Sequence, residues 1–286
     1  MSIGFDNSSR LCRDTWYFKY REVPFKLSQN NCRKWSDVLL TILPGTRDGA
    51  AQDRVYAIAS EFLSAVCWQN HSRVMMEPLG GMSCQDTFSL SNAKCQTFSF
   101  PRIAFPGKTS GHDISVLPQI ETAEQRTALL LYRDAMSSNH GYLSFLFYWQ
   151  ILETKGSNPI QWVDEMIDAH LSELGLSSEN GRDLPANGQS IGNYLNDDCR
   201  NAIAHIKRYP GKRELLLDSA ADALRIARST DLVRKLAEFY IRNKLSLTKR
   251  LHLVRTNGRG FPFYVDVDGP RTQSFKMAYK RLPPRY

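Results

Sequence analysis

The sequence predicts an α+β fold in which a mixed N-terminal region precedes an all-helical antiparallel bundle and a basic C-terminal β-hairpin or tail. Residues 1–110 combine short β-forming runs with one strongly periodic helix, and residues 122–249 hold long helical patterns with short connections. Residues 250–286 return to β-forming runs among basic residues. Proline and glycine recur between the first two regions, so residues 111–121 are the expected linker.

The N-terminal region contains three expected strands, Thr15–Tyr20, Arg73–Met76 and Cys95–Phe100, and one expected helix, Gln52–Trp68. Apolar residues recur along this helix at spacings of three and four, which is typical of an amphipathic helix lying on a sheet. They are Val55, Ile58, Ala59, Phe62, Leu63 and Val66. We expect this helix to serve packing.

Five helical segments are expected after the linker: Thr122–Ser137, Gly141–Lys155, Pro159–Leu174, Ser190–Arg208 and Leu215–Lys244. The segment Leu215–Lys244 could be broken near residues 229–231. A loop rich in Ser, Asn and Gly at 177–189 precedes Ser190, which is the expected N-cap of the next helix. The longest apolar run, Tyr142–Leu152, is well short of the roughly 20 residues needed to cross a bilayer. It therefore predicts a buried helix and no membrane partner.

The C-terminal tail contains two β-forming runs, Arg259–Val267 and Thr272–Leu282, around a turn at 268–270. Aromatic residues alternate with Arg and Lys in both runs. Such a surface can stack nucleic-acid bases while its cations hold phosphates. A hairpin that extends the N-terminal sheet and buries the rings fits the pattern equally well.

Cysteine and histidine spacing favours no metal site and no cofactor. The six cysteines form no C-x-x-C pair or zinc-finger spacing, and the six histidines are dispersed. The sequence also lacks a phosphate-binding glycine loop, a serine-nucleophile elbow and an H-E-x-x-H helix. Without an apparent secretory leader, these features predict a reduced, cytoplasmic protein.

Charge is distributed unevenly along the chain. Residues 1–199 carry 17 Lys and Arg against 22 Asp and Glu, whereas residues 200–286 carry 20 against 7. This asymmetry predicts an anionic partner, and nucleic acid is the commonest one. An acidic lipid surface or an acidic protein would satisfy the same charge.

The basic half begins with the candidate catalytic motif, residues 200–205, on the expected helix Ser190–Arg208. Arg200, Asn201 and His205 place a permanent cation, an amide and a side chain that titrates near neutral pH on one element. These residue types suit phosphodiester chemistry without a metal. A solvated helix face is the structural alternative, because an Arg and a His at this spacing are common by chance.

On a regular α-helix, Leu195, Cys199, Ala202, Ile203 and Ile206 form the core-facing stripe. A separate polar stripe contains Tyr194, Asp198, Asn201 and His205. Arg200 lies about 140° around the helix from His205, so one straight helix presents them poorly to one phosphate. The geometry therefore favours a composite site in a homodimer, either with Arg from one chain and His from the other or with both pairs framing one cleft.

The motif at 200–205 resembles the signature of HEPN domains, in which an Arg, a polar residue and a His occupy a late helix of a bundle. Four further segments resemble the MauJ-like group, named for methylamine-utilisation clusters: 128–135, 145–153, 192–195 and 199–205. The likeness covers roughly residues 50–245. Many HEPN proteins are metal-independent ribonucleases that act as dimers, often as toxins or antiphage effectors controlled by an inhibitory or activating protein partner.

The resemblance implies an RNA endonuclease that leaves a 2′,3′-cyclic phosphate. His205 would act as general base or acid, Arg200 would neutralise the scissile phosphate, and Asn201 would orient the ring or the phosphate. Lys207, Arg208, Lys212 and Arg213 are placed to hold the RNA backbone.

Glu153 resembles an acidic residue that positions the motif Arg, or it is a solvated glutamate at a helix end. Asp198 and Tyr194 are candidate supporting residues. Lys207 occupies the place of the Tyr found in one toxin subgroup, so membership of that subgroup is not expected. The alternative functions are a non-catalytic HEPN module that binds nucleic acid or a protein, and an accessory protein in amine metabolism.

Overall fold

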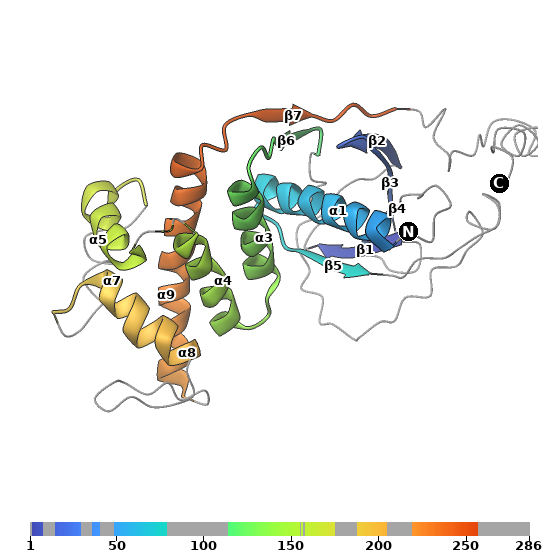
Figure 1. Cartoon of the computed structure of the whole chain (residues 1–286). Helices are drawn as coiled ribbons and strands as arrows, with labels where there is room; N and C mark the ends of the chain where they lie inside the picture. The colour runs from blue at the N-terminus through green and yellow to red at the C-terminus, as the bar shows by residue number, and fades with distance from the viewer. Residues whose placement is uncertain are drawn as a thin grey trace, which may run out of the picture. The chain divides into compact units, whose positions relative to one another are not determined.

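The computed structural model describes residues 2–7, 15–29, 36–40, 49–78, 114–154, 156, 158–174, 188–204 and 219–256 (Figure 1). The chain divides into two compact units. The first contains the described residues up to Leu117 and those from Arg250 on, and the second is Pro118–Lys249. The first unit combines strands with a helix and the second is helical, so the predicted α+β class with a helical bundle is confirmed.

The first unit contains a five-stranded antiparallel sheet with the strand order β2-β3-β4-β1-β5. The strands are β1 (Ser2–Asn7), β2 (Trp16–Tyr20), β3 (Val23–Gln29), β4 (Ser36–Leu40) and β5 (Val74–Pro78). The predicted strands at Thr15–Tyr20 and Arg73–Met76 correspond to β2 and β5. The predicted strand Cys95–Phe100 lies outside the described residues.

Helix α1 (Gly49–Asn70) packs on this sheet through an aromatic cluster (Figure 1). The Phe62 ring lies 5.1 Å from the Phe18 ring and 6.4 Å from the Phe25 ring, measured between centroids. The predicted apolar stripe is buried throughout. Burial extends beyond the stripe, however, because every residue from Ile58 to Trp68 is buried. Helix α1 is therefore enclosed on more than one face over this stretch.

The tight turn between β2 and β3 is held by a buried carboxylate. Tyr20 pairs with Val23, so Arg21 and Glu22 form a two-residue turn, with φ angles of 46° and 61°. Such turns usually contain Gly or Asn, because both central residues need positive φ. Here the Arg21 guanidinium and the Tyr20 hydroxyl both donate to Glu61 on α1, a carboxylate whose residue is 1% exposed. This ion pair compensates for the unfavourable turn residues.

A second, two-stranded sheet joins β6 (Val116–Pro118) and β7 (Arg250–His252). After β7 the chain reaches the outer strand of the five-stranded sheet, where the Thr256 amide donates to the Tyr17 carbonyl at 2.9 Å. The predicted β-forming runs that begin at Arg259 lie outside the described residues.

The helical unit is organised around α4 (Gly141–Glu153), which packs against both α3 (Ala123–Ser137) and α9 (Ala220–Phe239). Helix α5 (Pro159–His170) and a short π-helical segment, η2 (Tyr240–Lys244), complete this part of the unit. The predicted buried helix at 142–152 is α4. The described residues contain no helix with the length and apolar character required to cross a membrane.

Side-chain caps define where these helices begin. The Thr122 hydroxyl accepts the Gln125 amide, while the Gln125 side chain accepts the Thr122 amide, which makes a reciprocal capping box at α3. Asn158 caps α5 and Ser219 caps α9. Helix α9 runs without interruption through residues 229–231, so the break that the sequence allows there does not occur.

Candidate functional site

The helix that carries Arg200 is not a regular α-helix. It begins as α7 (Ile191–Asn193), continues as the π-helical segment η1 (Tyr194–Asn201), and resumes as α8 (Ala202–Ala204). The Ser190 hydroxyl accepts the Asn193 amide at 3.2 Å, so the predicted cap is confirmed. A π-helix closes i→i+5 hydrogen bonds and has more residues per turn than an α-helix. The predicted stripes assumed α-helical rotation, and that assumption is wrong for residues 194–201.

Arg225 on α9 holds the end of the π-helical segment. Its Nη1 donates to the main-chain oxygen of Asp198 at 2.6 Å, and its Nε donates to the Asp222 carboxylate at 3.1 Å. The Arg225 and Asp222 side chains are only 9% and 6% exposed. A side chain that satisfies main-chain groups is a recognised means of maintaining an irregular helix. Arg225 therefore links the geometry of η1 to α9.

Two predicted stripe residues of η1 point into the interior. Tyr194, expected on the polar stripe, is 6% exposed, so the polar-stripe prediction is wrong for this residue. Cys199, expected in the core, is fully buried, and its thiol lies 3.5 Å from the Ser229 hydroxyl. Burial raises the pKa of both Tyr194 and Cys199, because it disfavours their charged forms. These two side chains are suited to packing.

A glycine lets the motif helix approach α5 closely. The Gly192 amide donates to the Asp164 carboxylate at 2.7 Å. A Cβ atom placed on Gly192 would lie 2.3 Å from the main-chain oxygen of Ile160. No side chain is compatible with this approach, so the position of the motif helix depends on Gly192.

Arg200 and Glu153 form an ion pair between the motif helix and α4. The Arg200 Nε lies 3.4 Å from the Glu153 Oε1, and the side chains are 32% and 35% exposed. The same oxygen accepts the Trp149 indole N–H at 2.9 Å. Because Trp149 is 1% exposed, this bond fixes the carboxylate relative to the core. The guanidinium is thus oriented from α4 while remaining partly accessible to solvent.

Asn201 contacts the Arg200 guanidinium as well. Its amide oxygen accepts from Arg200 Nη1 at 3.0 Å, and its amide nitrogen donates to the Asp197 carboxylate at 3.3 Å. Asn196 donates to the same Asp197 oxygen at 2.9 Å. Asn201 therefore connects the guanidinium to a carboxylate on its own helix. This contact orients Arg200, whereas the sequence predicted that Asn201 orients the histidine or the phosphate.

Asp198 belongs to a different part of the helix surface. Its carboxylate accepts from the Gln189 side chain at 2.7 Å, and its carbonyl accepts from Arg225. Of the predicted supporting residues, Glu153 contacts Arg200 directly, Asp198 stabilises the helix itself, and Tyr194 is interior.

The remaining predicted site residues lie outside the described residues. They are His205, Lys207, Arg208, Lys212 and Arg213. In the ranges that the structure describes, no three side chains among His, Cys, Asp and Glu gather closely enough to hold a metal ion.

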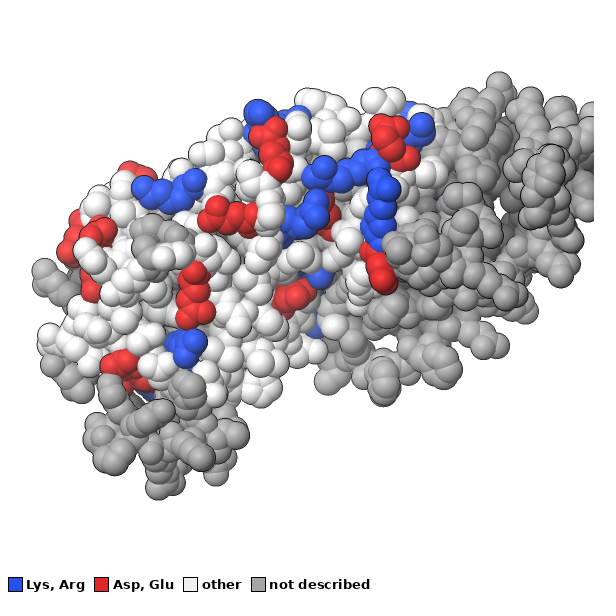
Figure 2. Space-filling model, in the orientation of Figure 1, with Lys and Arg blue, Asp and Glu red and all other residues white. Residues whose placement is uncertain are grey.

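On the face shown in Figure 2, the described Lys and Arg residues are interspersed with Asp and Glu. Lys249 lies 2.7 Å from Glu121, and Arg234 lies 2.6 Å from Asp231. Arg242 lies 3.8 Å from Glu238. Asp231 and Glu238 belong to residues 200–286 themselves, so of these three carboxylates only Glu121 offsets part of the excess positive charge of that stretch.

The family model described as methylamine utilization protein MauJ matches residues 128–242, which include α4, the motif helix up to Ala204 and α9. This stretch is MauJ-like, as the sequence resemblance suggested. Neither curated proteins nor solved structures gave a significant match.

Proposed function

We propose that the helical unit is a metal-independent endoribonuclease that acts as a homodimer. The observation that supports this proposal best is the partly exposed Arg200, held between Glu153 and Asn201 at the end of the π-helical segment. A planar guanidinium in a fixed orientation is suited to a phosphate. The side chain with acid–base chemistry, His205, follows five residues later in the sequence.

The proposed reaction needs one base, one acid and one cation. His205 removes the proton from the RNA 2′-hydroxyl, and the O2′–P bond forms as the P–O5′ bond breaks. The leaving 5′ oxygen takes a proton from a water molecule, and the hydroxide left behind takes the proton from His205. Arg200 stabilises the charge on the phosphate oxygens. The products are a 2′,3′-cyclic phosphate and a 5′-hydroxyl, with no metal required.

Glu153 and Asn201 are positioning residues in this mechanism. Glu153 is fixed by Trp149 and restricts where the guanidinium can lie. The opposing carboxylate also partly neutralises Arg200 before RNA binds. A phosphate must therefore compete with Glu153 for the guanidinium, and the Asn201 contact keeps Arg200 oriented meanwhile.

RNA cleavage in the presence of EDTA tests the proposal. The wild-type protein should release fragments with 2′,3′-cyclic phosphate ends. Arg200→Ala should lower the rate by about 10²-fold to 10³-fold, and His205→Ala by about 10²-fold to 10⁴-fold. Two matched controls, Arg234→Ala and His252→Ala, should retain wild-type rates. Intact RNA with wild-type protein at concentrations that permit dimerisation would refute the nuclease.

Mixing the two inactive variants tests the composite site. If Arg200 and His205 act from different chains, half of the dimers are mixed and each has one intact site, which restores about a quarter of wild-type activity. If both residues act from the same chain, the mixture stays inactive. An inactive mixture that forms mixed dimers by native mass spectrometry would exclude the composite site.

The family match favours a second candidate, an accessory protein in methylamine utilisation. This function requires no RNA cleavage. A methylamine-using host that loses growth on methylamine when the gene is deleted, and regains it with the Arg200→Ala variant, would support it. Failure of Arg200→Ala to restore growth, where wild type succeeds, would argue that Arg200 is needed for either role.

The remaining alternative is that the helical unit is a non-catalytic module that binds nucleic acid or a protein. The Arg200–Glu153 pair favours it insofar as a carboxylate already occupies the guanidinium. A non-catalytic module should bind RNA or a protein with unchanged RNA length. Binding that persists in His205→Ala but weakens in Arg200→Ala would identify it.

A further inference from the structure

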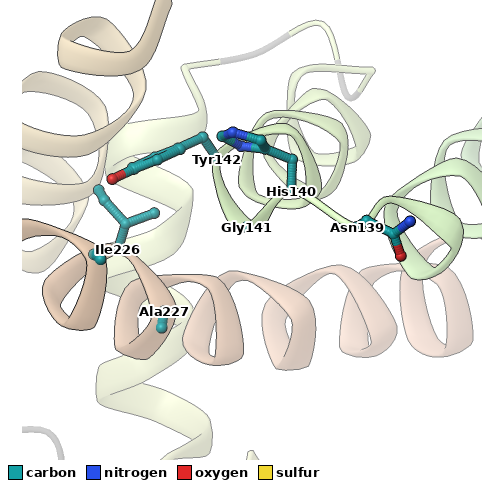
Figure 3. Close-up of a pocket in the computed structure, with 7 residues that line it drawn as sticks. Asn139, His140, Gly141, Tyr142, Ile226 and Ala227 are labelled. Atoms are coloured by element: carbon teal, nitrogen blue, oxygen red, sulfur yellow. The ribbon is translucent and has the colours of Figure 1, made fainter. Parts of the chain in front are cut away.

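A hollow of about 240 Å³ lies between the α3–α4 turn and helix α9 (Figure 3). It belongs to the helical unit and is distinct from the Arg200–Glu153 pair. Its lining includes Asn139, His140 and Tyr142 from the turn and the start of α4, and Ala223, Ile226 and Ala227 from α9. None of the functions proposed above uses these residues.

Small side chains create this space. Ala223 and Ala227 lie four residues apart on α9, so they share one face of that helix. Opposite them, Gly141 begins α4, and a Cβ atom placed there would have no other atom within 4 Å. An engineered cavity of about 150 Å³ holds benzene in another protein, so the volume here accommodates one ring with a small substituent.

The start of α4 brings hydrogen-bond donors to the hollow. His140 is the residue at the start of α4, where its carbonyl oxygen accepts a hydrogen bond from the Ser144 amide at 3.0 Å. The His140 side chain makes no capping hydrogen bond to the helix. The amides of the first turn of α4 therefore point toward this end of the helix. The imidazole of His140 lies beside the Tyr142 ring, with centroids 5.1 Å apart. In Figure 3 both rings project from the same turn.

The Tyr142 hydroxyl is an independent indication of a ligand. It is buried, and no hydrogen-bond partner for it exists in the part of the chain that the structure describes. In Figure 3 the phenol extends toward Ile226, which also lines the hollow. A buried hydroxyl without a partner costs about 1–3 kcal/mol. An acceptor brought by a ligand would recover that hydrogen bond.

From these contacts we propose that the hollow binds a small organic anion with an apolar body. The apolar body packs against Ile226 and Ala227. The charged oxygens accept hydrogen bonds from His140, from the amides that open α4, and from Tyr142 after a small rotation of its side chain. An oxyanion suits this environment, because helix amino ends favour negative charge and donors need acceptors.

This site lies apart from the candidate catalytic pair. His140 precedes α4 and Glu153 ends it, so their main-chain positions are about 20 Å apart along a helix of this length. Ile226 nevertheless directly follows Arg225, which holds the π-helical segment. The ligand would therefore contact the turn of α9 that supports the motif helix.

Titrations with three compounds of one size test the proposal: benzoate, phenyl phosphate and benzylamine. Binding is followed by calorimetry and by the shift of the melting temperature, with the full-length protein. At least one anion should bind, about tenfold or more tighter than benzylamine. The preferred anion identifies the group as carboxylate or phosphate. No binding of either anion, or equal binding of benzylamine, would overturn the proposal.

Two substitutions on α9 locate the site. Ala227→Leu fills the hollow and should weaken the preferred anion about tenfold or more, whereas the matched control Ala221→Leu should change affinity less than about twofold. Both positions are exposed on the same helix, and circular dichroism checks that both variants fold. His140→Gln and Tyr142→Phe should each weaken binding. Undiminished binding to Ala227→Leu would place the ligand elsewhere and refute this site.

Discussion

Replacing Gly192 with Ala should destabilise the helical unit, because the new side chain collides with the main chain of α5. The added Cβ would lie 2.3 Å from the Ile160 carbonyl oxygen and 2.9 Å from its carbon. Ordinary carbon–oxygen contacts are about 3.3–3.6 Å, so the two helices must separate by about 1 Å. No side-chain rotation relieves this contact, because the obstructing atoms belong to the main chain.

The energetic cost has two parts. Overpacking of this kind costs about 1–3 kcal/mol, and separation also weakens the 2.7 Å hydrogen bond from Gly192 to Asp164, which is worth about 1.5–3 kcal/mol. The better helix propensity of Ala returns up to about 1 kcal/mol. We therefore expect a net loss of about 2–4 kcal/mol in the free energy of unfolding of the helical unit.

Urea unfolding followed by circular dichroism measures this loss, and Gly141→Ala is the matched control. Gly141 also lies at a helix start, but its added Cβ meets nothing within 4 Å. That variant should change the free energy of unfolding by less than about 1 kcal/mol. Equal stability of the two variants would refute the close approach of the motif helix to α5.

Three further predictions follow from the helical unit. Glu153→Gln keeps an acceptor for Trp149 but loses the charge, so the free energy of unfolding in urea should change by less than about 1 kcal/mol. The initial rate of RNA cleavage should fall about tenfold. An unchanged rate would show that Glu153 does not position Arg200. Arg225→Met removes the buried ion pair with Asp222 and the hydrogen bond to the Asp198 carbonyl, and it should cost about 3 kcal/mol in urea unfolding, several times more than Arg234→Met at an exposed pair. Burial raises the pKa of Cys199, so the unfolded chain ionises first as the pH rises above 9.0. The contribution of Cys199 to stability is therefore fully present below pH 9.0 and declines above it. Above pH 9.0, the difference in unfolding free energy between wild type and Cys199→Ala should shrink as the pH rises. A difference that stays constant would contradict the raised pKa of Cys199.

Local patterns predicted the helices well because each pattern is satisfied within a few residues. The stripe on α1, the apolar run of α4 and the Ser190 cap all correspond to observed structure. These features depend on helix periodicity and on hydrogen bonds to neighbouring amides.

Local sequence patterns did not predict the conformation of the β2–β3 turn or of the motif helix. Neither Arg21 nor Glu22 is a usual residue for positive φ, and the compensating Glu61 lies about 40 residues away in the sequence. Similarly, nothing in residues 194–201 indicates a π-helix. Its supporting contact comes from Arg225, more than 20 residues further along the chain.

For the candidate site, the sequence by itself determined which chemical groups are present. It established the order of Arg200, Asn201 and His205 and the change from an acidic to a basic chain, and it left Glu153 either as a partner of Arg200 or as a solvated glutamate. The tertiary structure decided how the described groups are oriented. It placed Glu153 against Arg200, turned Asn201 toward the guanidinium, and buried Tyr194. The physical reason is that residue type fixes the available charge and hydrogen bonds, whereas orientation depends on packing between helices that are distant in the sequence.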